Sequence, residues 1–474
     1  MIALEQTTRF LINEPPAYLR RPVVNLQPVL AKQGQMNIDL ARLAGVIDGV
    51  GRVLDPVVIT SPEHWASVIG GLGAEVDGIL PVSISAYPTE IWNSHPQPLV
   101  ARQLPLVFWS ILQFDEPDFW RWSARDFLQA LGIDVHLVRH NRHGLALLRA
   151  LAMKRFLAQA KIVVFGEQNF PWNATDGGQL VTESLGTRII VRSLADMRDR
   201  YAQFSDEEVA CVWAERKGRY IEQDVRPDQL MNAVRTYLAI KSILEEEQAL
   251  GFGVNCFGDL ITGGGHDMPC LAQVLLREDG YIASCDGDYL AMMSMVLTSF
   301  FLDKPCMMSN MYPVQYVGAI TDHFGDALTP DPARYQREEW PQLARLAHCG
   351  YAGVVSPEMA PTGKVTLNDW GGTYEMKRDG LGCGIDGELA AGQHATIVQL
   401  KFNGRTLLAV DAEVCETTRH ANMRHCEATA LLKFRDLPGF IDNISREHSV
   451  LCYGEHVEDF QVLAGVLGLE CKVF

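Results

Sequence analysis

The largely apolar stretch Gly280–Pro313 contains polar residues that could do chemistry, among them Asp286, Asp288 and Asn310. Asp286 and Asp288 separate a short apolar segment from a longer apolar run, and Asn310 lies in a second short segment further on. A carboxylate can act as general base, general acid or metal ligand, and an amide oxygen can act as a neutral ligand. The stretch predicts a strand, an acidic turn, a buried helix and a second strand. Because strand ends in α/β folds deliver side chains to a common crevice, we expect Asp286 and Asn310 to share an active site.

Each aspartate also has a structural interpretation. Asp288 directly precedes the apolar run Tyr289–Leu302, which is the usual place for a helix N-cap. Asp286 follows apolar residues, where a carboxylate costs stability unless it is paired, hydrogen-bonded or bound to a cation, so a functional role is favoured for it. The run Tyr289–Leu302 is shorter than the ~20 residues of a membrane span and is closed by an aspartate at each end, so it predicts a core helix.

Continuous apolar strands that alternate with helices predict an α/β fold whose parallel sheets are covered on both faces. The first series of strands is Pro22–Val29, Val57–Thr60, Gly78–Ile84 and Leu106–Trp109. The second series begins after a long helix and comprises Lys161–Glu167, Arg188–Val191, Phe252–Phe257 and the strands of the opening stretch. We therefore expect two consecutive Rossmann-like α/β domains, residues 1–155 and 156–325, with the site residues Asp286 and Asn310 in the second.

The sequence pattern changes in the last third of the chain, where prolines and predicted turns separate short segments of alternating apolar and polar residues. Asn403-Gly404 lies between Ala395–Leu400 and Thr406–Val410, which is a strong hairpin signal. This pattern predicts an antiparallel, β-barrel-like C-terminal domain over residues 326–474.

Composition limits the partners and the compartment. The 474 residues carry a formal net charge of −17, which nucleic acids and anionic membrane surfaces would repel. The eleven cysteines are scattered without a C-x-x-C pair, as is typical of reduced core residues in a cytosolic protein. The opening residues lack the basic and apolar segments of a secretory signal. We expect a cytoplasmic protein that binds a small molecule or a cation, with neither nucleic acid nor membrane as partner.

Three further motifs carry weaker signals. Glu167 and the loop after it follow a predicted strand, where such folds place ligand contacts, although a solvated loop is equally compatible. The loop Gly263–Asp267 lacks the lysine and the spacing of phosphate-binding motifs, so nucleotide binding is not expected. One Cys/His cluster fits no standard zinc spacing and is expected to consist of surface or hydrogen-bonded residues: Cys415, His420, His425 and Cys426.

Three short motifs, in order, resemble the L-fucose and L-arabinose isomerase group of ketol isomerases. Cys285-Asp286-Gly287-Asp288 before an apolar helix is similar to the C-E-x-D turn of that family, and Leu346–Gly350 is similar to its H-C-G segment. Glu447–His456 is similar to its C-terminal histidine followed by a V-x-x-x-G strand. The layout of two α/β domains and an antiparallel β domain matches over nearly the whole chain.

The resemblance implies a manganese site. In that family a glutamate, a second carboxylate and a C-terminal histidine hold the ion, and these positions fall on Asp286, Asn310 and His448. Two of the three depart from the pattern. Aspartate in place of glutamate shortens the reach by one methylene, and asparagine in place of a carboxylate removes a negative charge and a proton acceptor.

Ketol isomerisation moves a proton between adjacent carbons through an enediolate, so it needs a base, an acid and a cation that stabilises the oxyanion. The resemblance implies Asp286 as base and ligand. Asn310 cannot take a proton, so another residue must be the second acid or base. The candidates are Asp288, His348, Glu167 and His323.

In addition to Glu167, aromatic residues on predicted turns beside the candidate crevice offer substrate contacts. Trp370 and Tyr374 could stack on a sugar face, although aromatic turn residues more often serve packing. The resemblance also implies a homo-oligomer, a trimer or a hexamer, with sites completed by neighbouring subunits.

The sequence thus favours a metal-dependent aldose–ketose isomerase that acts on an open-chain sugar through an enediolate. A weakened metal site leaves open a lyase or decarboxylase acting on a sugar or sugar acid, because C–C cleavage also yields an enediolate. A non-catalytic sugar-binding protein with the same fold is the third alternative. The sequence does not identify the sugar.

Overall fold

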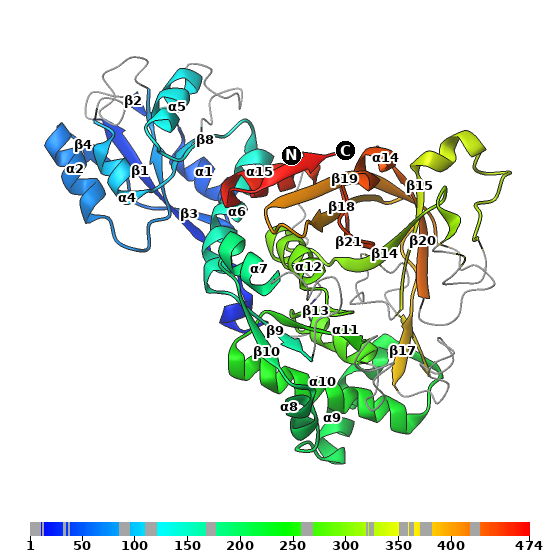
Figure 1. Cartoon of the computed structure of the whole chain (residues 1–474). Helices are drawn as coiled ribbons and strands as arrows, with labels where there is room; N and C mark the ends of the chain where they lie inside the picture. Colours follow the sequence, from blue (N-terminus) through cyan, green and yellow to red (C-terminus); the bar gives the residue numbers. More distant parts are fainter. Residues whose placement is uncertain are drawn as a thin grey trace. The chain divides into compact units, whose positions relative to one another are not determined.

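A computed structural model gives the structure of residues 11, 14–31, 35–36, 38–84, 95–109, 121–166, 177–256, 269–318, 321, 327–349, 359, 365–369, 382–417 and 427–474. The chain forms two compact units (Figure 1), one of residues 21–156 and one of residues 1–20 together with 157–474. Among the described residues, no helix combines the length and the apolar character needed to cross a membrane.

The unit of residues 21–156 is built on a parallel sheet. Its strand order is β3-β1-β5-β7-β8, with β4 also paired to β1. The strands are β1 (Val24–Ala31), β3 (Gly51–Val53), β4 (Val57–Ile59), β5 (Gly78–Pro81), β7 (Leu106–Phe108) and β8 (Val135–Leu137). The helices are α1 (Leu40–Ile47), α2 (Pro62–Gly71), α4 (Gln97–Arg102), α5 (Arg121–Ala130) and α6 (Asn141–Gln159), the last of which crosses the boundary of the unit. A short pair, β2 (Gln35–Met36) with β6 (Ser83–Ile84), completes the unit.

Apolar side chains from strands and helices form the core of this unit. Trp65 and Ile69 of α2 lie in one buried cluster with Ile79, Phe108 and strand residues of β8. Helix α2 begins where Ser61 accepts a hydrogen bond from the His64 N–H, and Pro62 occupies the first helical position. Both features are typical of helix starts.

The larger unit contains a second parallel sheet, with strand order β10-β9-β12-β13. Its strands are β9 (Lys161–Phe165), β10 (Arg188–Arg192), β12 (Gly251–Val254) and β13 (Ile282–Ser284). The accompanying helices are α7 (Gly177–Leu185), α8 (Leu194–Tyr201), α9 (Asp206–Arg216), α10 (Pro227–Glu247) and α11 (Cys270–Glu278). Glycine is required at the start of β12, because a Cβ on Gly251 would lie 2.0 Å from the carbonyl oxygen of Ile282.

A closed antiparallel barrel follows in the same unit. The six strands pair in the cycle β18-β21-β14-β15-β20-β19, and β19 pairs back to β18. They are β14 (Met307–Pro313), β15 (Leu343–Cys349), β18 (His394–Leu400), β19 (Thr406–Glu416), β20 (Glu427–Phe434) and β21 (His448–Tyr453). Strand β22 (Glu470–Val473) adds to β19 in parallel, after helix α15 (Val457–Leu467). Closure satisfies the backbone groups that an open sheet leaves at its edges.

Helix α12 (Tyr289–Leu302) connects the parallel sheet to the barrel (Figure 1), and it contacts β13, β14, β18 and β21. All of its residues are buried. Each fully buried large apolar side chain contributes about 1.5–3 kcal/mol relative to exposure. The helix that follows the acidic turn is therefore the common core of the sheet and the barrel, and it fixes the turn relative to the barrel strands.

The predicted fold class is confirmed, because parallel α/β sheets are followed by an antiparallel barrel. The predicted hairpin at Asn403-Gly404 joins β18 to β19, with Gly404 at a positive φ of 64°. The larger unit also contains a small sheet of β11 (Tyr220–Asp224), β16 (Val365–Asp369) and β17 (Cys383–Asp386), and helix α14 (Leu437–Ile441). The division at residues 155 and 325 remains a prediction.

Candidate metal centre

A tight turn at the carboxyl end of β13 presents Asp286. The Asp288 N–H donates to the Cys285 carbonyl at 3.3 Å, and the two central residues have positive φ, 59° at Asp286 and 65° at Gly287. Positive φ at both central positions defines the type I′ turn, for which Asp-Gly is a preferred sequence. The Gly287 N–H also donates to the Val254 carbonyl at 3.0 Å, so the turn is held against β12.

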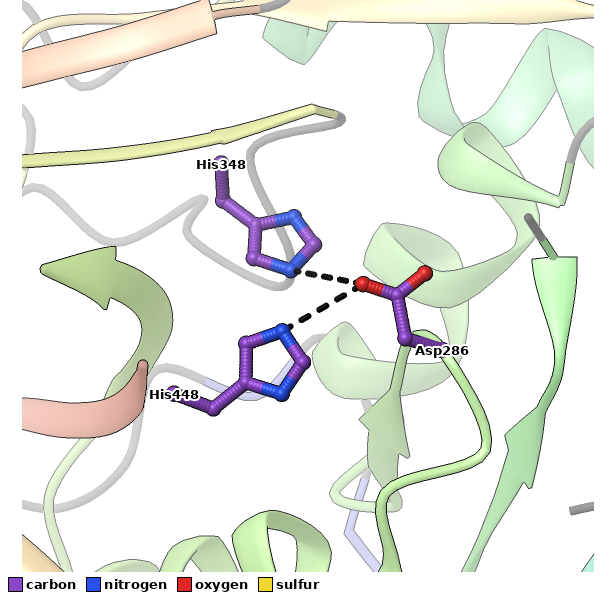
Figure 2. Close-up of side chains that lie close together, drawn as sticks. All are labelled: Asp286, His348 and His448. Carbon is purple, nitrogen blue, oxygen red and sulfur yellow. Dashed lines mark ion pairs between the residues drawn. The ribbon is translucent and has the colours of Figure 1, made fainter. Parts of the chain in front are cut away.

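Two imidazoles from the barrel converge on the Asp286 carboxylate (Figure 2). Nε2 of His448, on β21, lies 3.3 Å from Oδ2 of Asp286, and Nε2 of His348, on β15, lies 3.8 Å from the same oxygen. The three ligand atoms all lie within 4.8 Å of one another. Both histidine side chains are buried. Residues from the parallel sheet and from two barrel strands thus form one group whose donor atoms could bind a common cation.

The electrostatics of this group favour positive charge. Burial alone would lower the pKa of His448, but hydrogen bonds and charges from Asp286 and Asp288 raise it to about 10. Burial alone would raise the pKa of Asp286, but the hydrogen bond and charge of His448 and the charge of His348 hold it well below its usual range. The Asp286 carboxylate is therefore ionised, and the two aspartates stabilise positive charge at His448.

Asp288 supports His448 from behind. Its Oδ2 lies 2.9 Å from Nδ1 of His448 and 2.6 Å from Nε of Arg446, and its Oδ1 accepts a hydrogen bond from the Ala291 N–H at 2.8 Å. The side chain of Asp288 is completely buried. A carboxylate at Nδ1 fixes the imidazole so that Nε2 faces the Asp286 side. Metal-bound histidines are commonly oriented by a carboxylate in the same way. The N-cap interpretation of Asp288 is also confirmed.

Asn310 is the cross-strand neighbour of His448 in the β14–β21 ladder. Its Nδ2 donates to the Tyr312 hydroxyl at 3.4 Å. Its Oδ1 is buried and, among the described residues, has no hydrogen-bond partner. A buried amide oxygen without a partner costs free energy unless a ligand satisfies it. Asn310 thus adds an available oxygen donor on the strand beside His448.

Two residues of this centre were not predicted from the sequence. The Cys256 thiol, just past β12, donates to Oδ1 of Asp286 at 3.2 Å and accepts from the Asp286 N–H at 3.4 Å. Arg446 pairs with Asp288 as described above. The one available signal for Cys256 is its position at the end of a predicted strand, and for Arg446 it is a cation two residues before His448.

Some predicted residues lie outside the described part of the chain. These are Glu167, Trp370 and Tyr374 for substrate, His323 as an alternative acid or base, the loop Gly263–Asp267, and His420, His425 and Cys426. Of the Cys/His cluster only Cys415 is described, and its thiol donates to the Glu413 carbonyl.

The donor set fits a divalent cation. Imidazole nitrogen and carboxylate oxygen are common ligands of divalent metals. His448 is oriented by the buried Asp288 carboxylate, and the amide oxygen of Asn310 has no partner among the described residues. His348 was predicted as an acid or base, and the geometry also gives it a place in the donor set.

Comparison with known families gives an independent result for the middle of the chain. Residues 161–300 match the family model of the L-arabinose isomerase central domain. The matched range includes Asp286 and Asp288 and ends before Asn310, His348 and His448. No curated protein matches the chain.

Proposed function

The chain belongs to the L-arabinose and L-fucose isomerase superfamily, and on this premise we propose that it is a metal-dependent aldose–ketose isomerase working through an enediolate. The family match suggests a sugar isomerase in general terms. The observation that carries the finer proposal is the convergence of Asp286, His348 and His448 at the carboxyl end of the parallel sheet. Ligand sites of α/β sheets lie at this end.

Asp286, His348 and His448 would hold the cation, with Asn310 as a neutral fourth donor. When bound, a divalent cation stabilises the negative charge that develops on the substrate oxygens. The resemblance implies manganese as this ion. In our proposal His348 and His448 present their Nε2 atoms, and Asp288 keeps the His448 ring in that orientation through its contact with Nδ1.

Asp286 is our candidate for the base that moves the substrate proton. Its carboxylate is ionised and retains some exposure, 17% of the side chain. Asp288 has no exposed surface and all its contacts are internal, so we assign it a positioning role through His448. The candidates for the second acid or base are Glu167, His323 and His348; His348 would act through Nδ1, because its Nε2 is assigned to the cation.

The other predicted features belong to the same proposal. Glu167, Trp370 and Tyr374 would contact the sugar. The enzyme would be cytoplasmic and would assemble as a homo-oligomer, a trimer or a hexamer, as the resemblance implies.

A lyase or decarboxylase acting on a sugar or sugar acid is the second candidate. The observation that favours it is Asn310, because an amide cannot relay the proton that isomerisation requires of a second carboxylate. Cleavage of a C–C bond also produces an enediolate that a cation would stabilise, but it does not require a second carboxylate to move a proton between adjacent carbons.

Solvent deuterium exchange tests the proposal directly. The purified protein is stripped of metal, manganese is added back, and deuterium uptake is followed in pentoses, 6-deoxyhexoses and their ketoses. We expect exchange that depends on metal and is lost in Asp286→Ala and His448→Ala. Glu413→Gln, which changes an exposed carboxylate on β19, serves as the control and should leave exchange unchanged.

Deuterium exchange that does not depend on added metal would contradict the proposal of a metal-dependent isomerase. If no sugar in the panel exchanges while metal binds, the second candidate is tested with sugar acids, and release of carbon dioxide or of a shorter fragment would support it. Binding of sugars without any turnover would favour the non-catalytic alternative.

A further inference from the structure

Among the described residues, the metal centre has one carboxylate whose charge is not already paired with an arginine. Asp286 is the one carboxylate that shares the donor group with the two imidazoles in the described part of the chain. The charge of Asp288 is paired with the Arg446 guanidinium at 2.6 Å, and both side chains are almost completely buried. From the described residues, a divalent cation here would therefore meet one negative charge and neutral nitrogen and amide donors.

The Cys256 thiol determines which oxygen of Asp286 is available. The thiol donates to Oδ1 at 3.2 Å and is itself fixed by the Asp286 N–H at 3.4 Å. Oδ2 is the oxygen that faces His348 and His448. Oδ1 is directed at Cys256 and Oδ2 at the imidazoles, so we expect the carboxylate to bind a cation through Oδ2 as a single ligand. Oδ1 keeps a lone pair for the proton that Asp286 would move.

Among the described residues, the available donors are then two imidazole nitrogens, one carboxylate oxygen and the Asn310 amide oxygen. Sites of two histidines and one carboxylate are typical of catalytic zinc and of non-haem ferrous iron. Manganese favours sites richer in oxygen ligands and stands at the weak end of the affinity order of divalent metals. Few ligands and low charge both disfavour it.

We propose that this centre takes a borderline divalent cation of the zinc or ferrous class at low coordination number, held through Oδ2 of Asp286 alone, and that it binds manganese weakly. This inference deepens the proposed function, because it specifies the cofactor of the same site. It gives Cys256 the role of a positioning residue that keeps Asp286 monodentate.

Cobalt(II) is the probe for coordination number, because four- and five-coordinate cobalt absorbs visible light far more strongly than six-coordinate cobalt. Metal-stripped protein is titrated with cobalt and its spectrum recorded. We expect strong visible bands at one equivalent in the wild type and in Cys256→Ser, whose hydroxyl can still donate to Oδ1. In Cys256→Ala, Oδ1 is released to chelate, so the bands should weaken.

Manganese binding is measured in parallel by the loss of the free-ion electron paramagnetic resonance signal. The wild type should leave most manganese free at about 0.1 mM, corresponding to a dissociation constant near or above a millimolar. Asn310→Asp, which adds one charge at nearly constant shape, should tighten manganese binding at least about tenfold. Circular dichroism establishes that each variant is folded.

Weak, six-coordinate cobalt bands in the wild type, or manganese bound as tightly as cobalt, would overturn the inference, and so would the absence of metal binding. No sugar enters these measurements. A protein that binds cobalt as expected but exchanges no sugar contradicts only the isomerase proposal, and manganese-supported exchange with tight manganese binding contradicts only this inference.

Discussion

Replacement of Arg446 by methionine should destabilise the centre, because Asp288 loses its buried cationic partner. In Arg446→Met the volume is approximately kept, but Asp288 loses the cation 2.6 Å from its Oδ2. The side chains of Arg446 and Asp288 have relative exposures of 2% and 0%, so water cannot replace the lost partner. Breaking a buried ion pair on one side typically costs 3–5 kcal/mol, and we expect a loss of about 4 kcal/mol in local stability.

Hydrogen exchange of backbone amides in α12 and β21 is the appropriate assay, because the chain has two compact units and global unfolding need not be two-state. Lys433→Met is the matched control. Lys433 pairs with Glu339 at 2.8 Å, a similar separation, but the two side chains are 41% and 35% exposed. Exposed pairs are worth about 0–1 kcal/mol. The double variant Arg446→Met/Asp288→Asn, which removes both charges, should recover part of the loss.

The same variants give a metal readout. His448 depends on Asp288 for its orientation, and loss of such a partner typically lowers metal affinity 10–100-fold. We expect Asp288→Asn to weaken cobalt binding to this extent while its amide oxygen keeps the N-cap hydrogen bond to Ala291. A loss of stability below about 1 kcal/mol in Arg446→Met, comparable to the surface control, would refute the assignment of Arg446 and Asp288 as a stabilising buried ion pair.

Two further predictions concern stability away from the centre. Burial alone would raise the pKa of Asp279, but the charge of Arg216, 2.6 Å away, and other partners lower this pKa. The ionised Asp279 therefore stabilises the fold above the ordinary aspartate pKa of about 3.9, and this stabilisation is lost as pH falls. In urea titrations at several pH values, the stability difference between wild type and Asp279→Asn should be large at neutral pH and shrink below about pH 4; a difference independent of pH would contradict this. In the unit of residues 21–156, a Cβ on Gly144 would lie 2.4 Å from the Trp109 ring, so Gly144→Ala should cost about 1–3 kcal/mol by hydrogen exchange. Gly45→Ala, with nothing within 4 Å of its Cβ, should instead stabilise helix α1 by about 0.5–1 kcal/mol, and equal effects at both positions would contradict the packing argument.

Structural features that depend on residues close together in the sequence were predictable. The apolar run after Asp288 predicted α12, and Asn403-Gly404 predicted the β18–β19 hairpin. Both follow from local chemistry, namely an N-cap before a buried helix and a residue pair that tolerates positive φ. The position of Asp286 at the end of a buried strand was likewise available from the order of apolar and acidic residues.

Features that depend on tertiary pairing were not predictable from pattern. His448 and Asp288 are 160 residues apart and meet because β21 pairs with β14 beside α12. No periodicity in either segment encodes that distance. The role of Arg446 follows from this pairing, and the role of Cys256 follows from the pairing of β12 with β13, which brings it to the turn at Asp286. His448 was anticipated through family resemblance, whereas Asn310 was first expected at the site from its position on a predicted strand.

The two oxygens of Asp288 connect the fold to the chemistry of the centre. Oδ1 holds the first turn of α12 through Ala291, and Oδ2 contacts both His448 and Arg446. Since α12 begins immediately after the turn that presents Asp286, a shift of the helix start moves Asp286 and the support of His448 together. Catalytic geometry is sensitive to displacements of about 1 Å. Packing of α12 against the barrel therefore controls the separation of the donor atoms, and substitutions in this helix that leave every donor intact should still change metal affinity.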